Sequence, residues 1–575
     1  MPRTLLFGDL HVHSSWSFDA YGAGVTARPR DAYRYARGES IAHAGGVPIR
    51  LAGPPLDFMA LTDHAEYLGV MQAAFDPQHV LRKQPLIRSL TGDDPRARRL
   101  AFRRIRETFG RREGLPALTQ PSVVEPAWRA LVRLAQEQNR PGEFTTFAAF
   151  EYTSDVEGRN LHRNVLFRGS APARPYSSMD SRNPEDLWRW METSRAAGHD
   201  ALAIPHNPNG SDGRMFAATR FDGGPIDADW VALRARNEPA MEVFQIKGAS
   251  ETHPALSPDD PFAGFEIVDV RTTAPALASR PEGSYLRDAL RRGLAIAGAT
   301  GANPYRLGVI ASTDGHNAAS PFEEDNYTGK IGNNDSTPEA RLAVPAMPPG
   351  AEPVVSIVTR WGAAGLTGVW AKANTREGVF DAIRRRESYG TSGPRIRVRV
   401  AAGWTLPDGS DPGALLDRED AVAMGGVLPA RPEAAARPTF VIAAQRDPRS
   451  APLDRVQVVR GWMDGSGRTH ERVFDVVCAD GHAPGEHGDV CPASDAEPDP
   501  KTCAGSAEAG QAELRVRWQD PLPPSAGGTF YYVRVLEVPT CRWSTWDALR
   551  TKRPPPSGVP TTIQERAVTS PIWTH

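Results

Sequence analysis

Two histidines separated by one residue, His11 and His13, follow an apolar run at residues 5–7. Alternate residues of a β-strand point to the same face. If the apolar run is a strand, the two imidazoles leave its end side by side, and such a pair is half of a typical metal site. A His-x-His pair alone fits a polar loop equally well, so the rest of the chain must supply further ligands.

Further histidines and carboxylates adjoin later apolar runs, at residues 56–61, 145–150, 165–167, 201–204 and 307–310. The candidate ligands are His11, His13, Asp63, His64, Glu151, His162, His206, Asp314 and His316. Burying so many polar groups together is costly without a partner, and imidazole with carboxylate suits manganese, zinc or iron. Nine ligands exceed the needs of one ion, so we expect two or three divalent ions, with Glu151 suited to bridging.

Strand and helix patterns alternate up to about residue 390, with helices expected at 183–195, 284–292 and, on the surface, within 95–140. This alternation predicts an α/β fold with a parallel sheet or α/β barrel, whose carboxyl-terminal strand ends carry the chemistry. After Gly393-Pro394, strictly alternating runs such as 395–400, 439–442, 456–459, 514–518 and 530–536 predict an antiparallel β region. We therefore expect a domain at 1–394 and a β-rich domain at 395–575.

Composition narrows the class of protein. Of the 575 residues, 40% are hydrophobic and 24% are charged, and the net charge is -2. This charge balance does not predict the basic surface that nucleic-acid binding needs. No apolar run reaches the roughly 18–20 residues of a membrane span, and no signal peptide precedes the first strand. The oligomeric state is not readable. Four late cysteines, Cys478, Cys491, Cys503 and Cys541, suggest disulfides in any of three pairings, which favours the periplasm or secretion over the cytoplasm.

The ligand motifs occur in the order His11-x-His13, Thr62-Asp63-His64, Glu151, His162, Pro205-His206 and Asp314-x-His316. This order resembles the PHP (polymerase and histidinol phosphatase) superfamily. Longer phrases at 160–164, 250–254, 303–305 and 532–537 make the whole chain similar to a PHP-like family, the domain of unknown function 3604. The resemblance implies a distorted (β/α)7 barrel, a multinuclear metal centre built from the nine ligands, and phosphoester hydrolysis. The last motif, Ser312-Thr313-Asp314-Gly315-His316, departs from Ser-Asp-Ala-His but keeps the Asp–His spacing.

The resulting hypothesis is a phosphoesterase that hydrolyses small phosphate mono- or diesters with a metal-bound hydroxide. Lys247 and Arg163 are predicted to hold the phosphate, and Glu251 with His253 to protonate the leaving oxygen. Further residues expected to bind substrate or orient ligands are Arg214, Asn160, Asn207 and Asn317. The three cations, Lys247, Arg163 and Arg214, could equally be ordinary surface residues. Glu251 and His253 could equally belong to a capped loop with a local hydrogen bond. The alternatives are a metal-dependent hydrolase of amides, lactones or carboxyl esters, and a non-catalytic metal-binding protein.

Overall fold

The computed structural model describes residues 3–92, 94–109, 114–343, 357–362, 364–406, 412–479, 484, 490–492, 494, 496–505 and 509–574. Its largest unit is a ten-stranded mixed sheet. In spatial order its strands are β19 (Thr469–Cys478), β18 (Leu453–Met463), β21 (Thr529–Glu537), β24 (Arg566–Thr569), β14 (Ser388–Thr391), β13 (Leu366–Ala371), β1 (Thr4–Val12), β2 (Phe58–Leu61) and β3 (Thr145–Phe147), with β25 (Ile572–Thr574) paired to β21.

Smaller sheets complete the β structure. A three-stranded sheet has the order β4 (Ala149–Tyr152), β7 (Arg163–Phe167) and β8 (Ala201–Pro205), and β9 (Ala240–Glu242) pairs with β12 (Gly308–Ile310). A four-stranded sheet has the order β16 (Val422–Ala423), β15 (Arg397–Gly403), β17 (Thr439–Gln445) and β20 (Glu513–Gln519). Two-residue strands form the pairs β5 (Asp155–Val156) with β6 (Arg159–Asn160), β10 (Phe244–Gln245) with β11 (Gly248–Ala249), and β22 (Thr540–Cys541) with β23 (Thr562–Ile563).

The mixed α/β fold with a β-rich C-terminal region is confirmed, but the described strands do not form a closed barrel. β1, β2 and β3 are parallel, as expected, whereas β7 runs antiparallel to both β4 and β8. The hydrogen-bonded pairing between strands is also interrupted. Between some neighbouring strands of the described chain, the pairing is reduced to isolated β-bridges, such as Val12 with Gly315 and His64 with Glu151. The chain is therefore not a plain β/α repeat.

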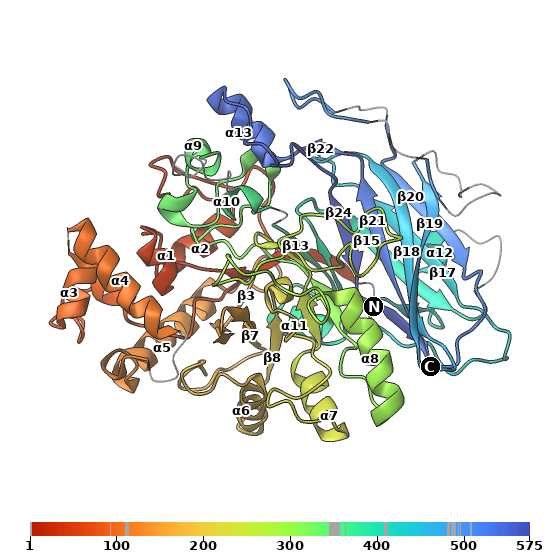
Figure 1. The fold of residues 1–575 in the computed structure, drawn as a ribbon, viewed down its shortest axis with the longest axis horizontal. Helices are drawn as coiled ribbons and strands as arrows, with labels where there is room; N and C mark the ends of the chain where they lie inside the picture. Colours follow the sequence, from red (N-terminus) through yellow and green to blue (C-terminus); the bar gives the residue numbers. More distant parts are fainter. Residues whose placement is uncertain are drawn as a thin grey trace.

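Helices flank the sheets. They are α1 (Phe18–Gly22), α2 (Pro29–Ala36), α3 (Pro85–Thr91), α4 (Pro95–Phe109), α5 (Pro121–Gln138), α6 (Pro184–Ala196), α7 (Ala228–Asn237), α8 (Leu286–Thr300), α9 (Pro338–Arg341), α10 (Ile357–Arg360), α11 (Arg376–Arg384), α12 (Pro412–Leu415) and α13 (Trp543–Thr551). Short 3-10 turns lie at Met71–Ala74, Pro116–Leu118, Pro208–Gly210, Glu324–Asn326 and Gly332–Asn334. Figure 1 shows α3 to α5 at the opposite end of the molecule from the C-terminal strands.

Local sequence explains several helix ends. Asn183 accepts a hydrogen bond from the backbone N of Glu185 and Pro184 occupies the first turn of α6, as a helix N-terminus favours. On α5, Trp128 and Leu131 are buried, whereas Leu134 is partly buried. α8 starts near the predicted position but continues to Thr300, because Leu294 and Ile296 extend its apolar face.

The ten-stranded sheet contains strands from both sides of residue 394, since β13 and β14 pair within the same sheet as β18 and β21. The division into two domains at that residue stays a prediction. Two disulfides, Cys478–Cys491 and Cys503–Cys541, resolve the three pairings left open by the sequence, and they indicate an oxidising environment. In the described part of the chain, no helix has the length and apolar character needed to cross a membrane.

Candidate metal centre

β1 carries the first two histidines. The strand does not end before the motif, as the apolar run suggested, but continues to Val12, so His11 lies within it and His13 directly after it. The segment that follows β12 holds this extension through two backbone hydrogen bonds of 2.8 Å. Asp314 N donates to His11 O, and His13 N donates to Gly315 O. Both imidazoles are fully buried and face the same cluster.

Six further side chains reach this cluster from positions within or next to five other strands. His64 follows β2, His206 follows β8, and Asp314 with His316 follow β12. Glu151 lies inside β4, and His162 directly precedes β7 rather than following a strand. Because β7 is antiparallel to β4 and β8, its beginning lies at the edge where its neighbours end. A histidine before β7 therefore meets histidines that follow other strands.

The Glu151 carboxylate lies at the centre of the cluster. Its Oε1 is 2.8 Å from Nδ1 of His162 and 3.1 Å from Nε2 of His206. Its Oε2 is 3.0 Å from Nε2 of His13, 3.3 Å from Nδ1 of His64 and 3.5 Å from Nε2 of His11. Each oxygen thus serves a different set of histidines, which is the arrangement that a carboxylate bridging two ions requires.

Asp314 divides its two oxygens in a similar way. Its Oδ1 lies 3.2 Å from Nε2 of His11 and 3.4 Å from Nε2 of His13, whereas its Oδ2 lies 2.6 Å from Nζ of Lys247 and 3.3 Å from Nζ of Lys330. The residue has a φ of 57°, in the left-handed region that few non-glycine residues occupy and that Asp tolerates better than most. Asp314 therefore links the histidines to two ammonium groups.

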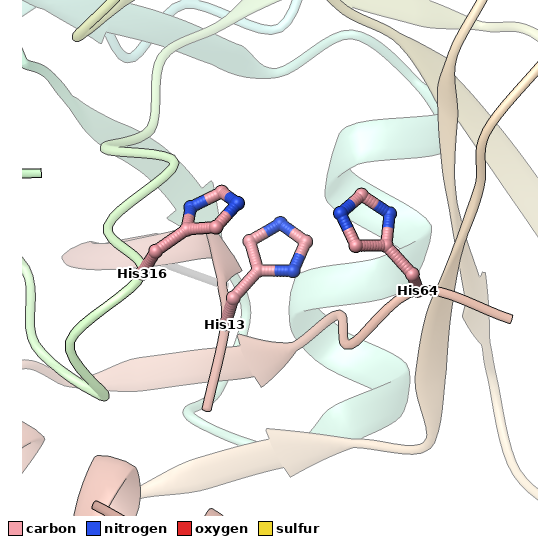
Figure 2. A group of neighbouring side chains, drawn as sticks. All are labelled: His13, His64 and His316. Atoms are coloured by element: carbon pink, nitrogen blue, oxygen red, sulfur yellow. The ribbon is translucent and has the colours of Figure 1, made fainter. Parts of the chain in front are cut away.

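A second grouping is made of His13, His64 and His316, whose rings lie next to one another in Figure 2, with His13 between the other two. Asp19 of α1 adds a carboxylate here, with its Oδ2 3.0 Å from Nε2 of His316 and 3.4 Å from Nε2 of His64. The three imidazoles have the spacing to hold an ion, and Asp19 places a carboxylate beside two of them.

The ligand atoms have the spacing that divalent ions need. Four overlapping groups bring their ligand atoms within 4.8 Å of one another: His13, His64 and His316; His11, His13 and Asp314; His11, His206 and Glu242; and Glu151, His162 and His206. Among the residues that the structure describes, several of these atoms are buried and have no hydrogen bond of acceptable geometry, in spite of the close contacts above, namely Nε2 of His11, His13 and His162, Nδ1 of His206 and Oδ1 of Asp314. Burying polar atoms without partners costs free energy, and cations bound by their lone pairs would offset that cost. The residues therefore fit divalent metal ions.

The electrostatics differ from one histidine of the cluster to the next. Burial would lower the pKa of His13, but the carboxylates of Asp314 and Glu151 outweigh it and raise that pKa to about 9, whereas other imidazoles are kept neutral. Burial lowers the pKa of His206 to about 4, and burial together with the nearby Lys330 charge lowers the pKa of His316 to about 4, which keeps both imidazoles neutral. Burial would raise the pKa of Glu151, but the surrounding histidines outweigh it and hold that pKa well below its usual value. Burial also raises the pKa of Glu242 well above normal, helped by the charge of Asp314, so its ionised form needs a nearby cation.

Asp63 has a different position from the one predicted. Its Oδ1 accepts from the backbone N of Ser14 at 2.7 Å and from Oγ of Ser17 at 2.8 Å, and its Oδ2 accepts from Oγ of Ser14 at 2.7 Å. It belongs to none of the four ligand groups of the described residues. Ser17 in turn contacts Nδ1 of His13 at 2.8 Å, so Asp63 orients a ligand through Ser17.

The three predicted asparagines lie beside ligands and are buried. Asn160 accepts a hydrogen bond from the backbone N of His162, and Asn317 joins the loop at Gly329 and Gly332. Asn207 has a φ of 47° and accepts from Nε2 of Gln245. Nδ2 of Asn160 and of Asn207 has no hydrogen-bond partner in the described structure, so these two amides retain donors near the cluster.

Among the predicted catalytic groups, the structure brings Lys247 to the cluster and places the others elsewhere. Glu251 binds Nη2 of Arg287 at 2.9 Å, Nη1 of Arg534 at 3.0 Å and the hydroxyl of Tyr532 at 2.7 Å. His253 accepts from the backbone N of Ala255, and no hydrogen bond joins it to Glu251 within the described residues. The predicted proton-donor pair is therefore not assembled.

Both predicted arginines lie outside the cluster as well. Arg163 donates from Nε to Oε1 of Glu238 at 2.8 Å and is almost fully buried, and Arg214 is exposed. Both line a separate cavity that contains none of the nine predicted ligands. Their phosphate-holding role stays a prediction, although their positions do not favour it.

Sequence reasoning missed three charged members of the cluster. Glu242 ends β9 within the apolar run at residues 241–246, where a carboxylate is a usable signal of a special role. Asp19 follows the first motif closely in α1. Lys330 lies in a loop without a recognisable motif, yet its Nζ is 2.7 Å from Nδ1 of His316 and 3.0 Å from the carbonyl oxygen of Asp314.

Comparisons with known proteins place this centre in context. A two-domain protein from Bacteroides vulgatus, containing a predicted PHP-like metal-dependent phosphoesterase, is similar with 11% identity over 90% of this chain and 96% of that chain, at a TM-score of 0.30. The ApaA protein from Bordetella pertussis matches 31% of this chain and 94% of its own with 12% identity and a TM-score of 0.13. No curated protein matches. The family model "Protein of unknown function (DUF3604)" matches residues 1–575, which confirms that part of the resemblance seen in the sequence, and the chain belongs to this family.

Proposed function

We propose that this protein is a metal-dependent hydrolase of phosphate mono- or diesters, of the PHP type, with two or three divalent ions in the His–carboxylate cluster. The observation that carries the proposal is Glu151, whose two oxygens face two different sets of histidines. Ions bound there would supply Lewis acidity, both to activate water and to neutralise charge on a phosphoryl oxygen. Manganese, zinc and iron all suit these ligands.

The chain's own residues define where a substrate enters. Asp19 and Lys247 are the most accessible of these charged members of the cluster, with 26% and 20% of their side chains exposed, whereas His11, His13 and His206 are fully buried. A phosphoryl group approaching from that side meets the ammonium of Lys247 first. Lys247 is held at 2.6 Å from Asp314 and can donate to an anionic oxygen, so it takes the binding role.

Metal content and substrate preference test the proposal together. The purified protein should contain at least two ions per chain and should hydrolyse p-nitrophenyl phosphate or its diester with manganese, zinc or iron, faster than matched esters and lactones. His13→Ala should abolish turnover, because His13 takes part in two of the ligand groups. Fewer than one ion per chain would favour a non-catalytic role, and preferential cleavage of lactones or esters would favour the other hydrolase class.

We further propose that the protein works in the periplasm or outside the cell. Both disulfides lie in the C-terminal β-rich region, where they close loops with sequence separations of 13 and 38 residues. Such bonds persist in oxidising compartments and are rare in the cytosol. Thiol labelling of protein taken from its native compartment should find all four cysteines protected.

A further inference from the structure

A cavity of about 300 Å³ shares the segment at residues 161–163 with the metal cluster. Its lining includes Leu161 and Arg163, the residues on either side of His162. Neighbouring residues of an extended chain point in opposite directions, so His162 faces Glu151 while its neighbours face the cavity. A ligand in this cavity is separated from the metal cluster by the backbone of this segment.

The inner wall of the cavity combines aromatic rings with guanidinium groups. Trp188 and Trp230 pack edge to face at 5.4 Å, and the guanidinium of Arg234 lies 5.4 Å and 5.5 Å from their ring centroids. Arg234 and Arg163 share a single carboxylate, Glu238, at 3.0 Å and 2.8 Å. The two buried guanidinium groups thus share one carboxylate. In addition, Nε of Arg234 has no hydrogen-bond partner among the described residues.

Cations without a carboxylate partner lie at the mouth. Neither Arg214 nor Arg280 forms an ion pair in the part of the chain that the structure describes, and both side chains are exposed. Two acidic residues of the described chain line the cavity: Glu185 is already engaged, since its Oε1 accepts from Nε1 of Trp230 and from the backbone N of Phe221, and Asp222 is exposed and accepts from the backbone N of Gly224. Arginines outnumber carboxylates in the lining, so the cavity offers positive charge next to the rings of Trp188 and Trp230, and its volume is at the small end of the size range of ligand sites.

We propose that this cavity binds a small organic anion, with its phosphate, phosphonate or carboxylate group held by Arg214 and Arg280 and its flat apolar part against Trp188 and Trp230. Guanidinium groups bind such anions through paired, charge-assisted hydrogen bonds. The site is distinct from the proposed phosphoesterase centre, and its ligand does not have to be a substrate.

Calorimetric titration of the full-length protein tests this site. Phenylphosphonate and benzoate carry both the anionic group and the ring, sulfate carries only the charge, and benzyl alcohol only the ring. We expect one equivalent of phenylphosphonate or benzoate to bind at least tenfold more tightly than sulfate or benzyl alcohol. The preference between the first two ligands identifies the anionic group that the site favours.

Each titration is repeated after chelation, so that binding at the metal cluster is excluded. Affinity should be the same in both states, and it should fall at least tenfold in R214A/R280A, whose exposed positions leave folding intact. The matched control is R437A, which removes another exposed arginine. Absence of saturable binding, dependence on metal ions, or full affinity in R214A/R280A would each overturn the proposal.

Discussion

Replacing Glu151 with glutamine is the sharpest perturbation of the proposed centre. Glutamine keeps the shape of the side chain but removes the negative charge, and one of the two oxygens becomes an NH2 group, which cannot bind a cation. The carboxylate lies within 3.5 Å of nitrogen atoms from five histidines, so the substitution affects both sides of the cluster at once. A loss of about 100-fold in metal affinity, or about 2.7 kcal/mol, is a modest expectation for a bridging ligand.

That loss appears directly in folding stability. An ion present at 1,000 times its Kd stabilises the folded state by about 4.1 kcal/mol, and after a 100-fold loss of affinity the same concentration contributes only about 1.4 kcal/mol. Denaturant unfolding with manganese and with chelator should therefore show that E151Q gains about 2.7 kcal/mol less from the metal than the wild type. The control is E143Q, which removes an exposed carboxylate nearby. An equal metal-induced gain in E151Q and wild type would refute the bridging role of Glu151.

Three further predictions concern stability. Asp63→Ala removes three hydrogen bonds from Ser14 and Ser17 and should cost about 3 kcal/mol in urea unfolding, with the number of bound ions unchanged at saturating metal. Burial, assisted by the charge of Arg341, lowers the pKa of His43 to about 4, so below pH 6.5 only the unfolded state takes up its proton and stability falls. Between pH 7 and 5 the wild type should lose about 1 kcal/mol more than His43→Gln, after discounting a full effect of about 2 kcal/mol for partial exposure. Replacing Cys503 and Cys541 by serine opens a link across 38 residues and should cost about 4 kcal/mol in thermal unfolding.

Each of these outcomes can fail in a recognisable way. Loss of an ion from Asp63→Ala would return Asp63 to the metal ligands predicted from the sequence. Parallel pH profiles for wild type and His43→Gln would mean that His43 titrates normally in the folded protein. An unchanged melting temperature after replacement of Cys503 and Cys541 by serine would show that this disulfide adds no constraint to the unfolded chain.

The sequence was most informative where polar ligands adjoin apolar runs. His11, His13, His64, His206, Asp314 and His316 were found in this way, and all of them lie in the cluster. The length of β1 was not predictable, because Asp9 is a charged residue that reads as the end of a strand. It is tolerated there because its carboxylate accepts hydrogen bonds from the backbone N of His11 and the hydroxyls of Thr313 and Ser320. The two hydroxyl partners, Thr313 and Ser320, lie 304 and 311 residues away in the chain.

Strand direction and the role of isolated charged residues were harder to predict. Nothing in the pattern of residues 163–167 distinguishes an antiparallel strand from a parallel one, so the sheet containing β7 was not predicted. Glu251 lies in the sequence motif at residues 250–254, from which a catalytic role was predicted. In the structure it instead forms ion pairs with Arg287 of α8 and Arg534 of β21. Ion pairs between such distant segments leave no periodic signal in the sequence, and they become visible only in the folded chain.

The buried ion pairs of Glu251 have a consequence for the chain as a whole. Asp260 joins the same group, at 2.8 Å from both Arg287 and Arg534, and neither arginine has any exposed side-chain surface. Arg534 comes from beyond residue 394, and so does Glu471, whose Oε1 lies 3.2 Å from Nη1 of Arg287. A fragment ending at residue 394 would therefore keep Glu251 and Asp260 facing a single guanidinium, and both carboxylates would lose the ion pair with Arg534 that the intact chain gives them. Such a fragment is expected to fold less stably than the same residues do within the whole protein.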